Sequence, residues 1–235
     1  MTGGESLAAT GRSPGAERLA ATGRSRDGPL TIAVPRGALF GPTLDLLERL
    51  GVDTAEVRAN DRKLLFEDVG IVTMRPGDVP TYVEHGAADI GITGKDVLLE
   101  APDRNVYELL DLGFGRCEMV VASRAGDDAL GESLRRLGRV RVATKYPLIA
   151  AHHFSRTGRQ AEIVTVKGSV ELAPLTGLVD GIVDLTATGK TLAENGLEAV
   201  EQIVTCTARL VANPVAHKLK AHEIDSLIER IRESA

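Results

Sequence analysis

Segment 180–191, Asp-Gly-Ile-Val-Asp-Leu-Thr-Ala-Thr-Gly-Lys-Thr, combines carboxylates, hydroxyls and an ammonium group in an order that suits phosphate binding. Its apolar residues predict a buried strand whose end carries Asp184 into a cleft. A helix is expected to begin near Thr191 or Leu192, and the unpaired N–H groups and dipole of a helix N-terminus favour an anion. The loop before this helix offers consecutive N–H groups, three hydroxyls and one ammonium, and it comprises Thr186, Ala187, Thr188, Gly189, Lys190 and Thr191.

The carboxylate of Asp184 narrows the choice of ligand. Like charges repel, so Asp184 is expected to accept hydrogen bonds from vicinal hydroxyls and not to touch the phosphate. A ribose 5-phosphate offers both groups. A P-loop is one alternative because Gly189-Lys190-Thr191 resembles its end, but that motif needs a glycine where Asp184 stands. An ordinary strand-to-helix turn with a capping threonine is the other alternative.

Two arginines are candidates for binding further phosphates. Arg36 follows Pro35 at the end of an expected strand and precedes Gly37, which lets an anion approach the backbone. Arg62 belongs to a polar cluster that spans residues 58–63. The competing interpretations are a surface arginine at a turn and a solvated charged face.

Three more charged residues occupy positions at or near predicted strand ends. Asp89 lies in an otherwise apolar strand, and it either caps a turn or lines a cleft. Lys145 and Glu171 each follow a predicted strand. The two cysteines, Cys117 and Cys206, lack zinc-ligand spacing and are predicted to be buried free thiols.

The elements that must position these side chains alternate between strand and helix. Such alternation predicts an α/β protein with mainly parallel strands, in which sites lie at the carboxyl ends of strands. A long strand over 200–211 and an amphipathic helix over 214–234 close the chain, so we expect two lobes, with the chain crossing over and returning. The other expected strands are 30–34, 71–74, 88–93, 119–122, 140–144 and 162–166, and the expected helices are 40–50, 79–85, 94–99 and 147–157.

Composition excludes several classes of protein. The 235-residue chain has a net charge of −5, so it lacks the positive charge of a duplex-binding protein. No apolar run approaches the roughly 18 to 20 residues that a membrane span needs, which predicts a cytoplasmic protein that binds no membrane. Residues 1–28 are rich in Gly, Ala, Ser, Thr and Arg, and they predict a disordered N-terminal tail.

Six motifs, in order, resemble the ATP phosphoribosyltransferase family, the first enzyme of histidine biosynthesis. They span nearly all of residues 30–213. They are Val34-Pro35-Arg36-Gly37, Arg62-Lys63-Leu64, Ala88-Asp89-Ile90-Gly91-Ile92-Thr93-Gly94, Gly113-Phe114-Gly115-Arg116-Cys117, Gly168-Ser169-Val170-Glu171-Leu172-Ala173-Pro174 and the segment 184–192.

The resemblance implies a fold of two periplasmic-binding-protein-like (type II) lobes with the active site in the cleft between them. We expect residues 29–118 and 207–235 to form lobe I and residues 119–206 to form lobe II. The implied reaction joins N1 of ATP to C1 of phosphoribosyl pyrophosphate and releases pyrophosphate, with magnesium bound through the substrate phosphates. The alternative is a non-catalytic two-lobed module that binds a small anion.

Roles follow from the same resemblance. Arg36 and Arg62 would be catalytic and bind pyrophosphate or the ATP phosphates. Residues 184–191 would hold the ribose 5-phosphate, while Asp89, Cys117 and Glu171 would lie near the nucleotides and Lys145 would face substrate. One departure is Ala38, because the family often has an arginine there.

The resemblance also points to the short form of the family. After the tail the chain has about 207 residues and ends at the amphipathic helix, which leaves no sequence for a C-terminal regulatory domain. Short-form enzymes are homodimers that assemble with a histidyl-tRNA-synthetase-like regulatory subunit into a hetero-octamer. Histidine feedback would then require that partner.

Overall fold

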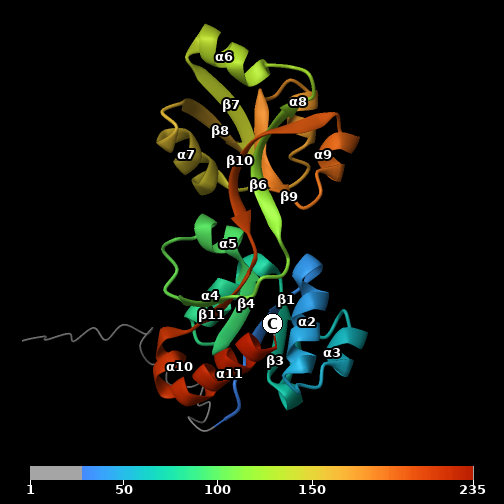
Figure 1. The fold of residues 1–235 in the computed structure, drawn as a ribbon, viewed down its shortest axis with the longest axis vertical. Coiled ribbons are helices and arrows are strands. Elements are labelled where there is room, and N and C mark those ends of the chain that lie inside the picture. The colour runs from blue at the N-terminus through green and yellow to red at the C-terminus, as the bar shows by residue number, and fades with distance from the viewer. Residues whose placement is uncertain (1–27, 235) are drawn as a thin grey trace, which may run out of the picture.

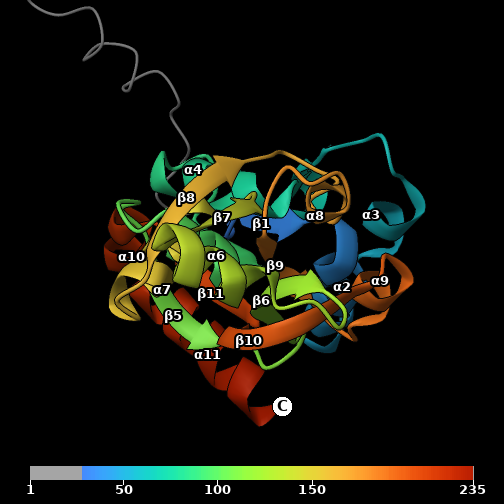
Figure 2. The same cartoon turned by 90° about the horizontal axis from the view of Figure 1, so that it is seen from above.

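The computed structural model describes residues 28–234. They form an elongated molecule of two lobes, each built around its own β-sheet (Figure 1). Seen from above, the lobes overlap along the long axis (Figure 2). The expected two-lobed α/β fold is therefore confirmed. The disordered tail expected for residues 1–28 lies outside the described residues, apart from Gly28.

The lower lobe in Figure 1 contains a sheet with strand order β2-β3-β1-β4-β11-β5. The chain contributes β1 to β5 to this sheet, then runs through the upper lobe, and returns to the sheet as β11. The residues of the sheet therefore come from two separate parts of the sequence. The strands are β1 (Ile32–Pro35), β2 (Leu65–Phe66), β3 (Ile71–Met74), β4 (Ile90–Gly94), β5 (Tyr107–Asp111) and β11 (Ala208–Ala212).

Helices cover both faces of this sheet, so its strands are apolar at successive positions. In β1, Ile32 and Val34 pack against one cluster, which includes Leu44 and Ile224 of two helices, while Ala33 packs against the other. The helices are α2 (Phe40–Arg49), α3 (Ala55–Ala59), α4 (Val79–Glu84), α5 (Lys95–Glu100), α10 (Pro214–Leu219) and α11 (Ala221–Glu233), with short 3₁₀ turns η1 (Gly37–Leu39), η2 (Glu67–Val69) and η3 (Pro76–Asp78).

The upper lobe contains a sheet with strand order β10-β6-β9-β7-β8. Its central strand β9 carries the acidic segment found in the sequence. The strands are β6 (Cys117–Arg124), β7 (Arg139–Thr144), β8 (Gln160–Thr165), β9 (Gly181–Thr186) and β10 (Leu197–Cys206), and the helices are α6 (Ala129–Leu137), α7 (Pro147–Arg156), α8 (Leu172–Leu175) and α9 (Lys190–Glu194).

The structure corrects three expectations about these elements. The single strand over 200–211 is two strands, because β10 pairs with β6 in one lobe and β11 pairs with β4 and β5 in the other. The helix over 214–234 is interrupted at Lys220, whose backbone leaves the helical region. Strands are not mainly parallel: among the described residues four strand pairs are parallel and five are antiparallel, since the returning strands run against their neighbours.

The remaining expected elements are confirmed, with ends that differ by at most two residues. Strand β5 and helix α6 were not predicted, because β5 is partly exposed and acidic and α6 has no buried residue. No helix within residues 28–234 is long and apolar enough to cross a lipid bilayer.

Candidate functional site

Strand β9 places Asp184 at the base of the predicted phosphate loop. Asp184 is only 7% exposed, and its Oδ1 accepts a hydrogen bond from the backbone N–H of Leu185 at 2.8 Å. The chain then leaves the sheet and turns through Gly189, whose φ of 73° is left-handed, into α9. Helix α9 begins at Lys190, one residue before the expected start.

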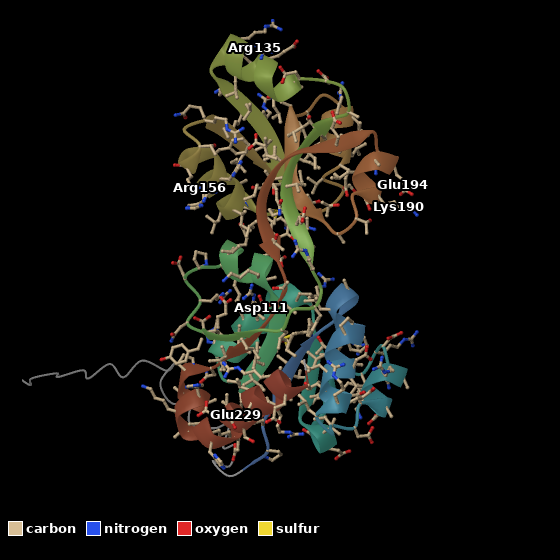
Figure 3. The ribbon with its side chains drawn as sticks, in the orientation of Figure 1. Asp111, Arg135, Arg156, Lys190, Glu194 and Glu229 are labelled. Atoms are coloured by element: carbon tan, nitrogen blue, oxygen red, sulfur yellow. The ribbon has the colours of Figure 1, made fainter. Side chains whose placement is uncertain are left out.

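The hydroxyls of the loop shape its own backbone. Thr186 Oγ1 accepts the N–H of Gly189 at 2.8 Å, and Thr188 Oγ1 accepts the N–H of Lys190 at 3.4 Å. The Lys190 side chain is 79% exposed and lies 3.8 Å from Glu194, at the outer edge of the upper lobe (Figure 3). The loop is thus preformed and its ammonium group is accessible to an anion.

Charged groups converge on Asp184. Lys145 Nζ lies 3.4 Å from Asp184 Oδ1, and Glu171 lies close enough to act on the same carboxyl group. Burial raises the pKa of Asp184, Lys145 opposes that shift, and the negative charge of Glu171 adds to it. A donor such as a sugar hydroxyl would therefore stabilise the ionised carboxylate.

Glu171 precedes α8 and is partly buried. Two residues before it, Ser169 has a φ of 49°, a left-handed conformation that is uncommon outside glycine. Such backbone conformations concentrate at functional sites. The structure therefore brings Lys145, Glu171 and Asp184 together, although Lys145 follows β7, Glu171 precedes α8 and Asp184 lies in β9.

A cavity of about 780 Å³ lies between the two lobes. The predicted residues Cys117, Lys145 and Ala187 line it, and so does Ala38. Much of its wall is apolar or backbone, which suits a flat nucleobase. Both lobes contribute, with Leu39, Pro76, Gly77, Gly94 and Val97 from the lower lobe and Tyr146 and Leu185 from the upper lobe.

The two predicted arginines differ in their surroundings. Arg36 lies over the ring of Phe40 at 4.4 Å and donates to the carbonyls of Asn60 and Lys63 at 3.0 and 3.1 Å. Its guanidinium thus fixes the loop that carries Arg62. Arg62 itself is exposed, and its N–H is held by Asn60 Oδ1 at 3.1 Å.

Asp89 does not line the interlobe cavity, and its predicted binding of substrate stays a prediction. Asp89 lies at the amino end of β4, whereas the cavity is lined by Gly94 at the carboxyl end of the same strand. Its Oδ2 accepts the N–H of Thr31 at 2.8 Å and lies 3.0 Å from Lys220 Nζ. Asp89 therefore joins β1 and β4 to the break between α10 and α11.

The two cysteines are opposite one another, because Cys206 of β10 pairs in register with Cys117 of β6. Both line the cavity, and Cys117 is half-buried. Burial raises the pKa of both thiols, and that of Cys206 reaches about 12. Both cysteines are free, as predicted, but their proximity could not be inferred from their separation in the sequence.

Sequence reasoning missed Asp96, Glu100 and Tyr146, which line the same cavity. Tyr146 Oη donates to Asp96 Oδ2 at 3.2 Å. Burial raises the pKa of Asp96. The sequence holds one indication that Tyr146 belongs to the site, because Tyr146 directly follows Lys145 at the end of a strand.

Known proteins resemble this chain along most of its length. A family model described as ATP phosphoribosyltransferase matches residues 75–233. The ATP phosphoribosyltransferase of Geobacillus sp. strain WCH70 is 46% identical over 210 residues, which cover 87% of this chain and 98% of that protein. That of Rubrobacter xylanophilus is 48% identical over 205 residues, covering 86% and 94%.

Solved structures agree with these sequence matches. The ATP phosphoribosyl transferase (HisG:HisZ) complex from Thermotoga maritima aligns with a TM-score of 0.72 and 35% identity, over 87% of this chain and 98% of that chain. The periplasmic aliphatic sulphonate binding protein SsuA from Escherichia coli aligns with a TM-score of 0.58 at 14% identity, over 88% and 72%. The second match supports the type II two-lobed fold alone.

Proposed function

The chain belongs to the ATP phosphoribosyltransferase family, whose members transfer the phosphoribosyl group of phosphoribosyl pyrophosphate to ATP, and we propose that the transfer takes place in the interlobe cavity. The observation that carries this proposal is the convergence of Lys145 and Asp184 on a preformed loop beside a cavity lined by both lobes. The reaction gives phosphoribosyl-ATP and pyrophosphate, the first step of histidine biosynthesis.

Phosphoribosyl pyrophosphate is proposed to bind to the upper lobe. The 5-phosphate would accept hydrogen bonds from the loop 186–191 and face Lys190, while the ribose hydroxyls would donate to Asp184. The low exposure of Asp184 supports this division, since a buried carboxylate is stabilised by donors that replace its lost hydration.

ATP is proposed to bind from the lower lobe. The small residues Ala38, Gly77 and Gly94 leave room for a nucleotide at the carboxyl ends of β1, β3 and β4. Arg62 would bind phosphate, and Arg36 would hold the Arg62 loop in place through the Asn60 and Lys63 carbonyls.

The proposed site matches the charges of the transition state. Breaking the bond between C1 and the pyrophosphate oxygen leaves positive charge on the ribose and negative charge on the leaving group. Arg62 and Lys145 would stabilise the second, and the carboxylates of Asp184 and Glu171 the first. The lone pair of N1 of ATP forms the new bond to C1 as the old bond breaks, and pyrophosphate takes the electron pair of the broken bond.

Magnesium is proposed to bind through the substrate phosphates and to neutralise part of their charge. The residues fit such a role, because burial and the negative charge of Glu171 raise the pKa of Asp184, and a cation nearby would relieve the repulsion between the two carboxylates. No cluster of three potential metal ligands occurs within residues 28–234.

We further propose that the chain acts in the cytoplasm, where ATP is available, as a homodimer that joins a histidyl-tRNA-synthetase-like regulatory subunit in a hetero-octamer. The HisG:HisZ complex of Thermotoga maritima supports such an assembly. Light scattering of the chain, alone and with the regulatory subunit, measures both masses. A monomer that stays a monomer when the subunit is added would contradict the proposal.

The activity is tested by pyrophosphate release. We expect release only when ATP, phosphoribosyl pyrophosphate and magnesium are all present, because the leaving group departs only upon attack by N1. Reactions that lack one substrate serve as controls. Absence of release, even with the regulatory subunit added, would refute the enzymatic function.

A further inference from the structure

Three hydrogen bonds join α5 of the lower lobe to the start of α7 in the upper lobe, where the two helices lie one above the other (Figure 1). Tyr146 Oη donates to Asp96 Oδ2 at 3.2 Å. The N–H groups of Leu148 and Ile149 donate to the two carboxylate oxygens of Glu100, at 2.9 and 3.0 Å. We name these three bonds the α5–α7 clasp.

The clasp satisfies groups that would otherwise lack partners. The first N–H groups of a helix have no acceptor within the helix. Here the carboxylate of Glu100, in the opposite lobe, accepts a hydrogen bond from each of two such N–H groups of α7. The negative charge of Glu100 also suits the positive end of the α7 dipole. Glu100 of the lower lobe therefore caps helix α7 of the upper lobe.

The clasp also reaches the ribose site. Tyr146 is only 9% exposed and directly follows Lys145, whose ammonium lies 3.4 Å from Asp184 and 5.1 Å from the centre of the Tyr146 ring. The N–H of Tyr146 is itself held by Thr144 Oγ1 at 2.9 Å. One short segment thus contacts α5 through its tyrosine and Asp184 through its lysine.

We propose that Tyr146 is a positioning residue of the transfer reaction, which aligns the two lobes through Asp96 and holds the Lys145 ammonium beside Asp184. This inference rests on the proposed function, in which the two substrates bind to different lobes. Their reacting atoms must approach within about 3 to 3.5 Å, so a small change in lobe register lowers the rate steeply. Its proposed effect on the reaction acts through Asp96 and Lys145.

The variant Tyr146→Phe tests the proposal in the full-length chain with its regulatory subunit, because it removes the hydroxyl and keeps the ring. We expect kcat for pyrophosphate release to fall about tenfold, with both KM values changed by less than about twofold. Tyr107→Phe is the matched control, since Tyr107 is exposed on β5 and packs edge-to-face with His217. It should retain the native kcat.

Variants of Asp96 separate positioning from a general structural effect. Asp96→Asn keeps an oxygen that accepts the tyrosine hydroxyl, so we expect a higher kcat than in Asp96→Ala. Asp96→Ala should be as slow as Tyr146→Phe, and the double variant Tyr146→Phe/Asp96→Ala no slower than either, because all three lose the same bond. Multiplied losses in the double variant, or a native kcat in Tyr146→Phe, would overturn the proposal.

Hydrogen exchange tests the clasp without any activity. In Glu100→Ala the amides of Leu148 and Ile149 should exchange at least tenfold faster than in the native chain, whereas amides of β8 should be unchanged. Unchanged exchange at Leu148 and Ile149 would overturn the clasp even if the native chain is active. A native chain that releases no pyrophosphate would instead refute the proposed function, and the positioning role with it.

Discussion

Burial of Asp184 has a cost in stability, which the proposed role of its carboxylate in ligand binding would explain. Its carboxylate is buried, and the raised pKa means that ionisation is less favourable in the folded chain than in the unfolded one. The folded chain then binds more protons between the two pKa values, so the free energy of unfolding falls as the pH rises through that interval. Above the raised pKa, the full free-energy cost of burying the ionised carboxylate remains.

We predict that Asp184→Asn raises Tm at neutral pH and weakens binding of phosphoribosyl pyrophosphate by at least tenfold. The amide carries no charge, which removes the penalty of burying a carboxylate, but it also removes the strong acceptor for the ribose hydroxyls. At pH 7.5, scanning calorimetry measures Tm and titration calorimetry measures the affinity. ATP binding should change by less than about twofold, and the gain in Tm should shrink as the pH is lowered below the raised pKa.

Lys190→Ala provides the comparison. Its exposed pair with Glu194 contributes little to stability, at most about 0.5 kcal/mol. This variant should therefore weaken phosphoribosyl pyrophosphate binding without raising Tm. Equal losses of affinity for ATP and for phosphoribosyl pyrophosphate in both variants would show that the loop does not bind the ribose 5-phosphate.

The loop between β9 and α9 depends on a left-handed residue. Gly189 has a φ of 73°, which directs its N–H to Thr186 Oγ1 and lets α9 begin at the next residue. Helix α9 is only five residues long, so its dipole is weak, and in the proposed site the fixed N–H groups of the loop would carry most of the anion binding.

We predict that Gly189→Ala lowers the free energy of unfolding by about 1 to 2 kcal/mol, because an L-residue is strained in this conformation. It should also weaken phosphoribosyl pyrophosphate binding by tenfold or more. The matched control is Gly138→Ala, since Gly138 ends α6 with a φ of 69° and, like Gly189, has open space where a Cβ would lie. Urea unfolding should give similar losses for both, and calorimetry a loss of affinity for Gly189→Ala alone.

Strands β6 and β10 connect the lobes (Figure 1). Cys117 at the start of β6 and Cys206 at the end of β10 line the cavity. Each lobe has its own apolar clusters, so the connection is made by these strands, by the α5–α7 clasp and by contacts around the cavity. Cys117 and Cys206 face one another at the point where both strands leave the upper lobe.

We predict that both thiols react slowly with iodoacetamide at pH 7.5, at least tenfold more slowly than glutathione, because burial raises their pKa and little thiolate is present. The rate should rise with pH. Cys117 should react before Cys206, which is only 1% exposed, and bound substrates should slow Cys117 further. Mass spectrometry after quenching measures each site, with the urea-unfolded chain as the control; native Cys206 reacting as fast as Cys117 would contradict the burial argument.

Local patterns in the sequence determined most of the elements and led to the proposed ribose site, because periodicity and loop chemistry depend on neighbouring residues. They gave the strand that carries Asp184, the Thr-rich loop and the alternation of an α/β fold. Only the tertiary structure placed Asp89 away from the cavity, set Cys117 opposite Cys206 and joined Tyr146 to Asp96. These facts depend on strand direction and on the docking of two lobes, which bring together residues far apart in the chain.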